Sequence, residues 1–379
     1  MLLFRIINSA LLIGFGISIN FVQGKAQPFC PVSIEKSAHL GAIWRHTPKL
    51  TTQTGALQWG QELGLRFQTN GRRDWHQWQR YPVFGVSVVH MHFGDGSHGD
   101  GYGLLPNLSI PVFRSGIFTA FFRLGTGLAW VTAPYDYFEN PGQNAIGSHW
   151  NNITQFRLGG ELRLSDHLRV HAGAGLTHFS NGAAALPNYG INLPSGYAGI
   201  AWSPKPVREK DFAPATSEKK AGRRWGATVQ GGLAFIEYAV FDGPKYPIRT
   251  ASVAGYFSFN KVNRALLGVD YEFNKAVFVF GQQIADFENQ AEARKGATRL
   301  ALFVADEFLF GQFGIQLQMG AYIGGSFNQY VFKRQYSKLT IRYYFPALFK
   351  TELQPHMGVT LKAHAATAEY ISMNAGLAF

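Results

Sequence analysis

The feature that most constrains this chain is the alternation of apolar and polar side chains along many short segments. In residues 313–321, Phe, Ile, Leu, Met and Ala alternate with Gly and Gln. Residues 339–345 and 357–364 show the same period of two. This period places one kind of side chain on each face of a β-strand. With 43 Gly, 32 Phe and only 15% charged residues among 379, the pattern predicts an all-β protein.

Two kinds of β protein alternate in this way: a sandwich with its apolar faces inward, and a membrane barrel with its apolar face outward. The strands are about nine to eleven residues long, which suits a tilted strand that crosses a bilayer. Their polar faces are rich in Gly, Gln and Arg, and aromatic residues collect near strand ends, as in residues 343–345. The last segment, 371–379, alternates back from Phe379 like the final strand of outer-membrane barrels. We therefore predict a transmembrane antiparallel β-barrel of the bacterial outer membrane.

Sixteen candidate strands follow from the pattern. They lie near residues 34–46, 58–70, 82–93, 102–114, 116–132, 153–164, 167–180, 190–203, 225–239, 248–260, 263–273, 297–309, 312–323, 337–345, 356–364 and 367–379. The polar stretch 204–224 is predicted to be a linker or turn between regions 27–203 and 225–379. Two architectures remain open: one large barrel, and an eight-stranded barrel with a second β-unit. Residues 282–294 form either a long loop or a short helix.

The N-terminus has the pattern of a secretory signal peptide over residues 1–26. Arg5 precedes an apolar run, and Gly24-Lys25-Ala26 offers a cleavage site after Ala26. Cleavage removes two basic residues and no acid, so the net charge of +12 falls to about +10. Cys30 is the only cysteine, so no internal disulfide can form, and the residues before it do not match a lipoprotein cleavage site. Beyond the leader, no apolar run approaches the ~18 residues of a membrane-spanning helix.

The segment 168–180 ends in two polar residues on its apolar face. His178 and Ser180 share that face with Leu168, Val170, Ala172, Ala174 and Leu176. In a membrane barrel this face meets lipid, where polar side chains are costly, so their presence suggests a purpose. Two positions apart on a strand, their Cβ atoms are about 6.5 Å apart, and side chains that lean together can form a hydrogen bond. A serine hydroxyl needs a neighbouring base to become a nucleophile, and histidine is the usual one.

A family resemblance follows from these residues. His178-Phe179-Ser180-Asn181, followed by Pro187-Asn188-Tyr189-Gly190, resembles the His-x-Ser-Asn…Pro-Asn-x-Gly motif of the lipid A 3-O-deacylase (PagL) family. Its members are eight-stranded outer-membrane barrels that remove an ester-linked acyl chain from lipid A. The specific match covers roughly residues 168–199. The final strands, with residues 358–362 and Phe379, are similar to those of longer relatives known as acyloxyacyl hydrolases.

The resemblance implies that Ser180 is the nucleophile and His178 the general base. The family orients its histidine with a glutamate two residues after the motif glycine, where this chain has Asn192. An amide can hold an imidazole in one tautomer but cannot stabilise the imidazolium with a full charge. We predict that Asn192 orients His178; the alternatives are a substitute acid or low activity. Oxyanion or substrate contacts are predicted for three further residues: Asn181, Gly182 and Asn188.

A plain turn is the competing interpretation of residues 178–182, because Asn181-Gly182 is a strong turn signal. The additional matches at Pro187, Asn188 and Gly190 favour the catalytic interpretation.

Three other segments carry residues that could form a site. A Gly-rich turn carries His90, His92, Asp95, His98 and Asp100. Histidines two residues apart share a face, as metal ligands can, but the composition is more typical of a surface loop, and no metal is predicted. The loop 144–152 either shapes a substrate groove or packs the rim. The basic stretch 219–224 is too short and too poor in aromatic neighbours for nucleic acid, and instead suits phosphate headgroups or water.

The sequence therefore predicts a cofactor-free esterase of the bacterial outer membrane that cleaves an acyl ester of lipopolysaccharide. Its other partners would be the outer membrane itself and, during biogenesis, the barrel-assembly machinery. The alternative is a non-catalytic barrel, a pore or structural protein, that keeps the turn of the motif and has lost its acid.

Overall fold

The computed structural model describes residues 32–51, 56–94, 96–208, 212–213, 224–324, 334–348, 351–364 and 367–379. The predicted leader 1–26, Cys30, Asp95, most of the linker 204–224 and the basic residues 219–223 lie outside this set. Among the described residues, no helix is both long enough and apolar enough to cross a membrane.

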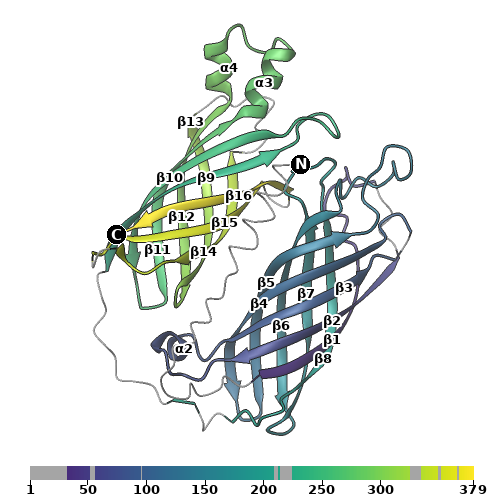
Figure 1. Ribbon diagram of the computed structural model, residues 1–379, viewed down its shortest axis with the longest axis vertical. Coiled ribbons are helices and arrows are strands. Elements are labelled where there is room, and N and C mark those ends of the chain that lie inside the picture. Colours follow the sequence, from purple (N-terminus) through teal and green to yellow (C-terminus); the bar gives the residue numbers. More distant parts are fainter. Residues whose placement is uncertain are drawn as a thin grey trace. The chain divides into compact units, whose positions relative to one another are not determined.

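The first eight strands form a closed antiparallel barrel (Figure 1). They are β1 Val32–Ala42, β2 Leu57–Gln68, β3 Val83–His92, β4 Asp100–Ser115, β5 Phe118–Val131, β6 Trp150–Arg163, β7 Leu168–Ser180 and β8 Ile191–Trp202. Each strand pairs with the next along the chain. The ring closes where β1 pairs with β8, with Ser37 opposite Gly199.

The remaining eight strands form a second closed barrel, coloured green to yellow in Figure 1. They are β9 Trp225–Ile236, β10 Tyr246–Ser258, β11 Asn263–Asn274, β12 Thr298–Phe310, β13 Phe313–Gly324, β14 Gln335–Tyr344, β15 Gln354–His364 and β16 Thr367–Ala378. The C-terminal strand β16 closes this ring against β9, with Ser372 opposite Ala234.

The predicted all-β barrel fold is confirmed, and the strands form two eight-stranded rings rather than one large barrel. The ambiguous segment after β11 contains two helices, α3 Lys275–Gln283 and α4 Gln290–Gly296. Each begins after an asparagine whose side chain accepts a hydrogen bond from a first-turn amide, a common start for a helix. A further short helix, α2 Asp74–Trp78, was not predicted. The first strand ends at Ala42, four residues before the predicted end.

Each barrel has an apolar outer wall and a polar interior. Outward residues such as Leu63, Val88 and Leu158 are 57%, 60% and 64% exposed. Their neighbours along the strands, such as Glu62 and Arg157, are 1% exposed. A water-soluble barrel would show the reverse arrangement, so the distribution is that of a wall in contact with lipid.

Buried ion pairs fill the interiors. In the first barrel, Arg123 binds both carboxylate oxygens of Glu35, and Arg157 pairs with Glu62. In the second, the corresponding pairs are Arg264–Glu307, Arg299–Glu272, Lys338–Asp270 and Lys362–Glu272. Charged groups at such depth are tolerated when they are paired and hydrogen-bonded. The side chains that line each interior therefore also hold its walls together.

Removal of Lys338 tests this role. Asp270 Oδ2 lies 2.6 Å from Lys338 Nζ and also accepts from Tyr336 and Gln318. Lys338→Met leaves a buried carboxylate without its cation, which we expect to lower the free energy of unfolding by about 3–5 kcal/mol. Urea unfolding of the purified protein in lipid vesicles, followed by tryptophan fluorescence, measures the loss.

The matched control is the exposed pair Arg208–Asp166, whose side chains are 42% and 39% exposed. Arg208→Met should leave the unfolding midpoint unchanged, because solvent screens exposed pairs. Equal effects of the two substitutions would contradict a structural role for the interior charges.

Candidate active site

The alternation along β7 sets the direction of two predicted site residues. Phe179 is fully buried in the apolar cluster inside the first barrel, with Ile153 and Leu193. Because successive side chains on a strand point to opposite faces, His178 and Ser180 are directed to the outer face. Ala172 and Ala174, farther along that face, are exposed.

Asn192 lies directly opposite His178 in the ladder between β7 and β8. Its neighbours Ile191 and Leu193 point into the apolar cluster, so the Asn192 side chain is on the outer face as well. His178 Nδ1 and Asn192 Oδ1 are 2.7 Å apart and form a hydrogen bond. Only a protonated Nδ1 can donate to this carbonyl oxygen, so in the neutral ring Nε2 carries the lone pair.

The loop between the two strands depends on two glycines with positive φ, Gly182 (62°) and Gly190 (80°). L-residues with a side chain rarely adopt this conformation. At Gly190 a Cβ atom would also lie 2.8 Å from His178 Cε1. The imidazole therefore rests against the motif glycine on one side and is hydrogen-bonded to Asn192.

Ser180 is held by the loop rather than by the histidine. Its hydroxyl donates to Asn188 Oδ1 at 3.3 Å and accepts from Asn188 Nδ2 at 3.0 Å. The Gly182 amide also donates to this oxygen, at 3.1 Å. Within the described part of the chain, no hydrogen bond joins Ser180 to His178. Ser180 is 1% exposed, and the loop occupies its hydroxyl with these three hydrogen bonds.

The predicted oxyanion residues surround the same hydroxyl. The Asn181 amide donates to Asn188 Oδ1 at 3.1 Å, while the Asn181 side chain donates to Ser148 Oγ at 2.9 Å. Ser148 belongs to the 144–152 segment, so this loop contacts the site loop directly. His149 instead packs the rim, stacked on Trp130 and hydrogen-bonded to the Val131 carbonyl.

Four more polar residues lie beside these side chains; three were not predicted, and the fourth, Asn152, ends the 144–152 segment named from the sequence. On β6, Asn152 lies opposite Ser180 and Thr154 opposite His178. Their side chains bond to each other and to Thr126 on β5. On the other side of the site, His46 Nδ1 lies 2.9 Å from Asn192 Nδ2. The signal for the first three was the one used for His178: polar residues at outward positions of an apolar strand face.

The histidine cluster at the β3–β4 turn is separate from this site. His92 Nδ1 and His90 Nε2 lie 2.9 Å and 3.3 Å from Asp100 Oδ1. The two rings also pack around Trp59 on the outer face of the barrel. Over the described ranges, no three His, Cys, Asp or Glu side chains are arranged to hold a metal ion.

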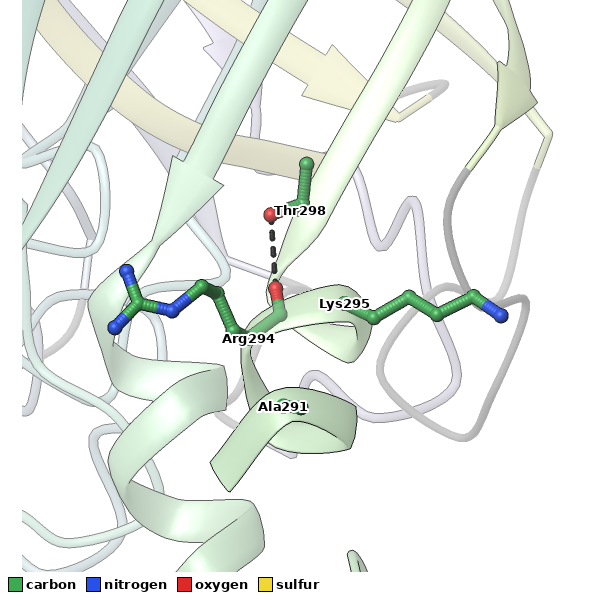
Figure 2. Close-up of a pocket in the computed structure, with 4 residues that line it drawn as sticks. All are labelled: Ala291, Arg294, Lys295 and Thr298. Carbon is green, nitrogen blue, oxygen red and sulfur yellow. Dashed lines mark hydrogen bonds between the residues drawn. The ribbon is translucent and has the colours of Figure 1, made fainter. Parts of the chain in front are cut away.

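The second barrel carries a shallow hollow of about 410 Å³ beside α4. Figure 2 shows its lining residues: Ala291, Arg294, Lys295 and Thr298. Thr298 Oγ1 donates to the Arg294 carbonyl at 2.8 Å, and the two basic side chains extend in opposite directions. They do not converge on a common point, so the hollow offers no two-point anion site.

Two protein-family models match the chain, one over each barrel. The lipid A 3-O-deacylase (PagL) model matches residues 59–201, and the acyloxyacyl hydrolase C-terminal domain model matches residues 223–379. The chain belongs to the lipid A 3-O-deacylase family. This membership and the barrel fold support the assignment of the chain as an outer-membrane lipid A deacylase, which is a type of hydrolase. The two matches together cover most of the chain, with each falling on one of the two barrels.

No curated protein matches the sequence. Among solved structures, CdiB from Acinetobacter baumannii is 9% identical, with a TM-score of 0.19 over 92% of this chain and 60% of that chain. A triple mutant of the Rhodopseudomonas blastica porin is 8% identical, with a TM-score of 0.18 over 92% of this chain and 99% of that chain. The chain thus spans 60% of the length of CdiB.

Gly190→Ala tests the placement of His178 in this deacylase. The added methyl group meets the imidazole and strains the backbone, and a displacement of about 1 Å in a group that takes part in a reaction can lower the rate about 100-fold. The measurement is fatty acid release from lipopolysaccharide by the purified protein. Gly196→Ala, in the adjoining strand β8 and with no atom within 4 Å of the added carbon, is the control and should retain full activity. Equal activities for the two variants would argue against a role for His178.

Proposed function

We propose that the protein is a serine esterase that removes an ester-linked acyl chain from lipid A at the outer wall of its first barrel. The observation that supports this most directly is the 2.7 Å bond from His178 to Asn192 on an outward strand face, two residues before Ser180. Together these groups supply a nucleophile, a base and a residue that orients the base, as acyl transfer requires.

The chemistry follows from these three roles. Ser180 Oγ attacks the ester carbonyl carbon while its proton moves to His178 Nε2. The tetrahedral intermediate collapses, the bond to the sugar oxygen breaks, and that oxygen takes the proton from His178. Water gives a proton to His178 and attacks the acyl-serine carbonyl carbon. The bond to Ser180 Oγ then breaks, Oγ takes the proton back from His178, and the fatty acid leaves. No cofactor takes part in any of these steps.

The resting hydrogen bonds of Ser180 define what must change before attack. Its side chain has to rotate away from Asn188 toward His178, because no bond joins the two in the described residues. Catalytic hydrogen bonds are often formed only in the substrate complex. In the structure, the Asn188 side-chain amide and the Gly182 N–H both donate to the Ser180 oxygen. After Ser180 rotates, these two donors become free to stabilise an oxyanion. The Asn181 N–H, now bonded to Asn188, is a third candidate.

The membrane position of the site follows from strand parity. With the N-terminus in the periplasm, β7 runs outward and its last residues reach the outer leaflet, where lipopolysaccharide resides. The short turn 164–167 then lies on the periplasmic side and the long loop 132–149 on the cell surface. The positive net charge of the chain suits the anionic phosphates of lipid A.

The side chains inside the two barrels argue against the alternative function, a pore. Arg123, Arg157 and Lys362 are among the largest fully buried side chains, and each forms an ion pair inside its barrel.

Ser180→Ala provides the direct test of the enzyme. Lipid A from cells that express the wild-type protein should lose the mass of one acyl chain, and cells with Ser180→Ala should keep it, because no nucleophile remains. Mass spectrometry of extracted lipid A measures the difference, and heat-modifiable gel mobility confirms that both proteins fold. Deacylation that persists in the variant would rule out Ser180 as the nucleophile.

A second measurement addresses the pore. The purified protein in a planar lipid bilayer should show no channel conductance above that of protein-free bilayers, because ion pairs occupy both interiors. A known porin under the same conditions is the positive control. Regular single-channel steps from this protein would support the non-catalytic alternative instead.

A further inference from the structure

Asn192 forms two side-chain hydrogen bonds, and both of its partners are histidines. Its Oδ1 accepts from His178 Nδ1 at 2.7 Å, and its Nδ2 lies 2.9 Å from His46 Nδ1. His46 follows the end of β1, 146 positions away in the sequence and outside the residues matched by the deacylase model. Asn192 is only 6% exposed, so water does not readily replace either bond.

Barrel closure brings these segments together. β1 pairs with β8 up to Gly41 opposite Ser195. Beyond the ladder, the Trp44 amide donates to the backbone carbonyl of Asn192 at 2.8 Å. This bond fixes the chain two residues before His46, so the imidazole lies beside the amide of Asn192.

An amide in this position has two orientations with opposite consequences. With Oδ1 toward His178, Nδ1 of that ring must carry the proton, and Nε2 is a base. With Nδ2 toward His178, Nδ1 must be the acceptor, and the proton moves to Nε2, where it blocks proton uptake from Ser180. A glutamate has no such ambiguity, because both of its oxygens accept. With Asn in place of Glu, a further contact is therefore required to select the orientation of the Asn192 side-chain amide.

His46 meets this need if its Nδ1 is the unprotonated nitrogen. An unprotonated Nδ1 accepts only from the Nδ2 side of the amide, which turns Oδ1 toward His178. A protonated Nδ1 would instead donate to the Trp44 carbonyl, 3.3 Å away, and would face the amide hydrogens of Asn192. The shorter contact to Asn192 favours the accepting form. The other ring nitrogen, Nε2, is buried and has no partner among the described residues, so it does not compete for Asn192.

We infer that His46 is a positioning residue, which fixes the Asn192 amide so that His178 keeps the tautomer of a general base. The inference rests on the proposed esterase function and extends it to a residue outside the motif. Hydrogen bonds in such a chain polarise one another, so the bond that Asn192 Nδ2 donates to His46 also makes Asn192 Oδ1 a stronger acceptor. The chain His178–Asn192–His46 thus replaces part of what a single glutamate provides.

Three variants test the role of His46. His46→Phe keeps the ring but removes the acceptor, and should lower the deacylation rate about five- to tenfold, the population change that one net hydrogen bond produces. His46→Asp places oxygens that can only accept near the position of Nδ1 and should retain most of the activity. His167→Phe, at a turn on the opposite end of the barrel with its Nδ1 bonded to the Ser203 carbonyl, is the matched control and should leave the rate unchanged.

A spectroscopic measurement separates orientation from general damage. The ¹³C shift of the His178 Cδ2 carbon reports its tautomer in labelled protein in micelles. It should indicate Nδ1–H in the wild-type protein and a mixture in His46→Phe. In an Asn192→Glu background, His46→Phe should have little effect on rate or tautomer, because a carboxylate accepts in either orientation.

The outcomes distinguish this inference from the proposed function. An unchanged rate and tautomer in His46→Phe, or an equal loss in the Asn192→Glu background, would overturn the role of His46 and leave the esterase proposal intact. Persistent deacylation by Ser180→Ala would overturn the esterase proposal, while the tautomer measurement would still decide what His46 does to His178.

Discussion

Both barrels depend on the closure of their hydrogen-bonded rings. A strand in an apolar medium must pair every backbone amide with a neighbour, and only a closed ring leaves no unpaired edge. In the first barrel β1 meets β8, and in the second β16 meets β9. Once the backbone is satisfied in this way, the outward side chains are free to be apolar. The inward ones can then be charged, because they pair across a narrow interior.

The candidate site uses the same two properties of the wall. Alternation directs Phe179 inward, which turns His178 and Ser180 outward, and the register between β7 and β8 sets Asn192 opposite His178. Ring closure then adds a contact that the two-strand motif lacks, because it brings the segment after β1 beside β8. The outward side chains are thus oriented by Phe179, which packs inside the barrel, and by the segment that follows β1.

The features that could be predicted from the sequence are those that follow from the local alternation of apolar and polar residues. The sixteen strands and the outward parity of position 178 needed only the period of two, and the pairing of His178 with Asn192 came from the family resemblance. His46 was not predicted, since its contact arises from closure over 146 positions. Neither was the resting bond of Ser180 to Asn188, which depends on the fold of the loop. Alternation also could not distinguish two rings from one, because it does not encode which strands close.

The outward direction of His178 and Ser180 bears on where a substrate can be during turnover. Under the proposed chemistry, the acyl chains of a lipid stay among their neighbours in the leaflet while the ester bond reacts. Enzyme and substrate then meet by lateral diffusion in two dimensions. The turnover rate would depend on the mole fraction of the lipid in its leaflet. Dilution of the membranes with additional water would leave the turnover rate unchanged.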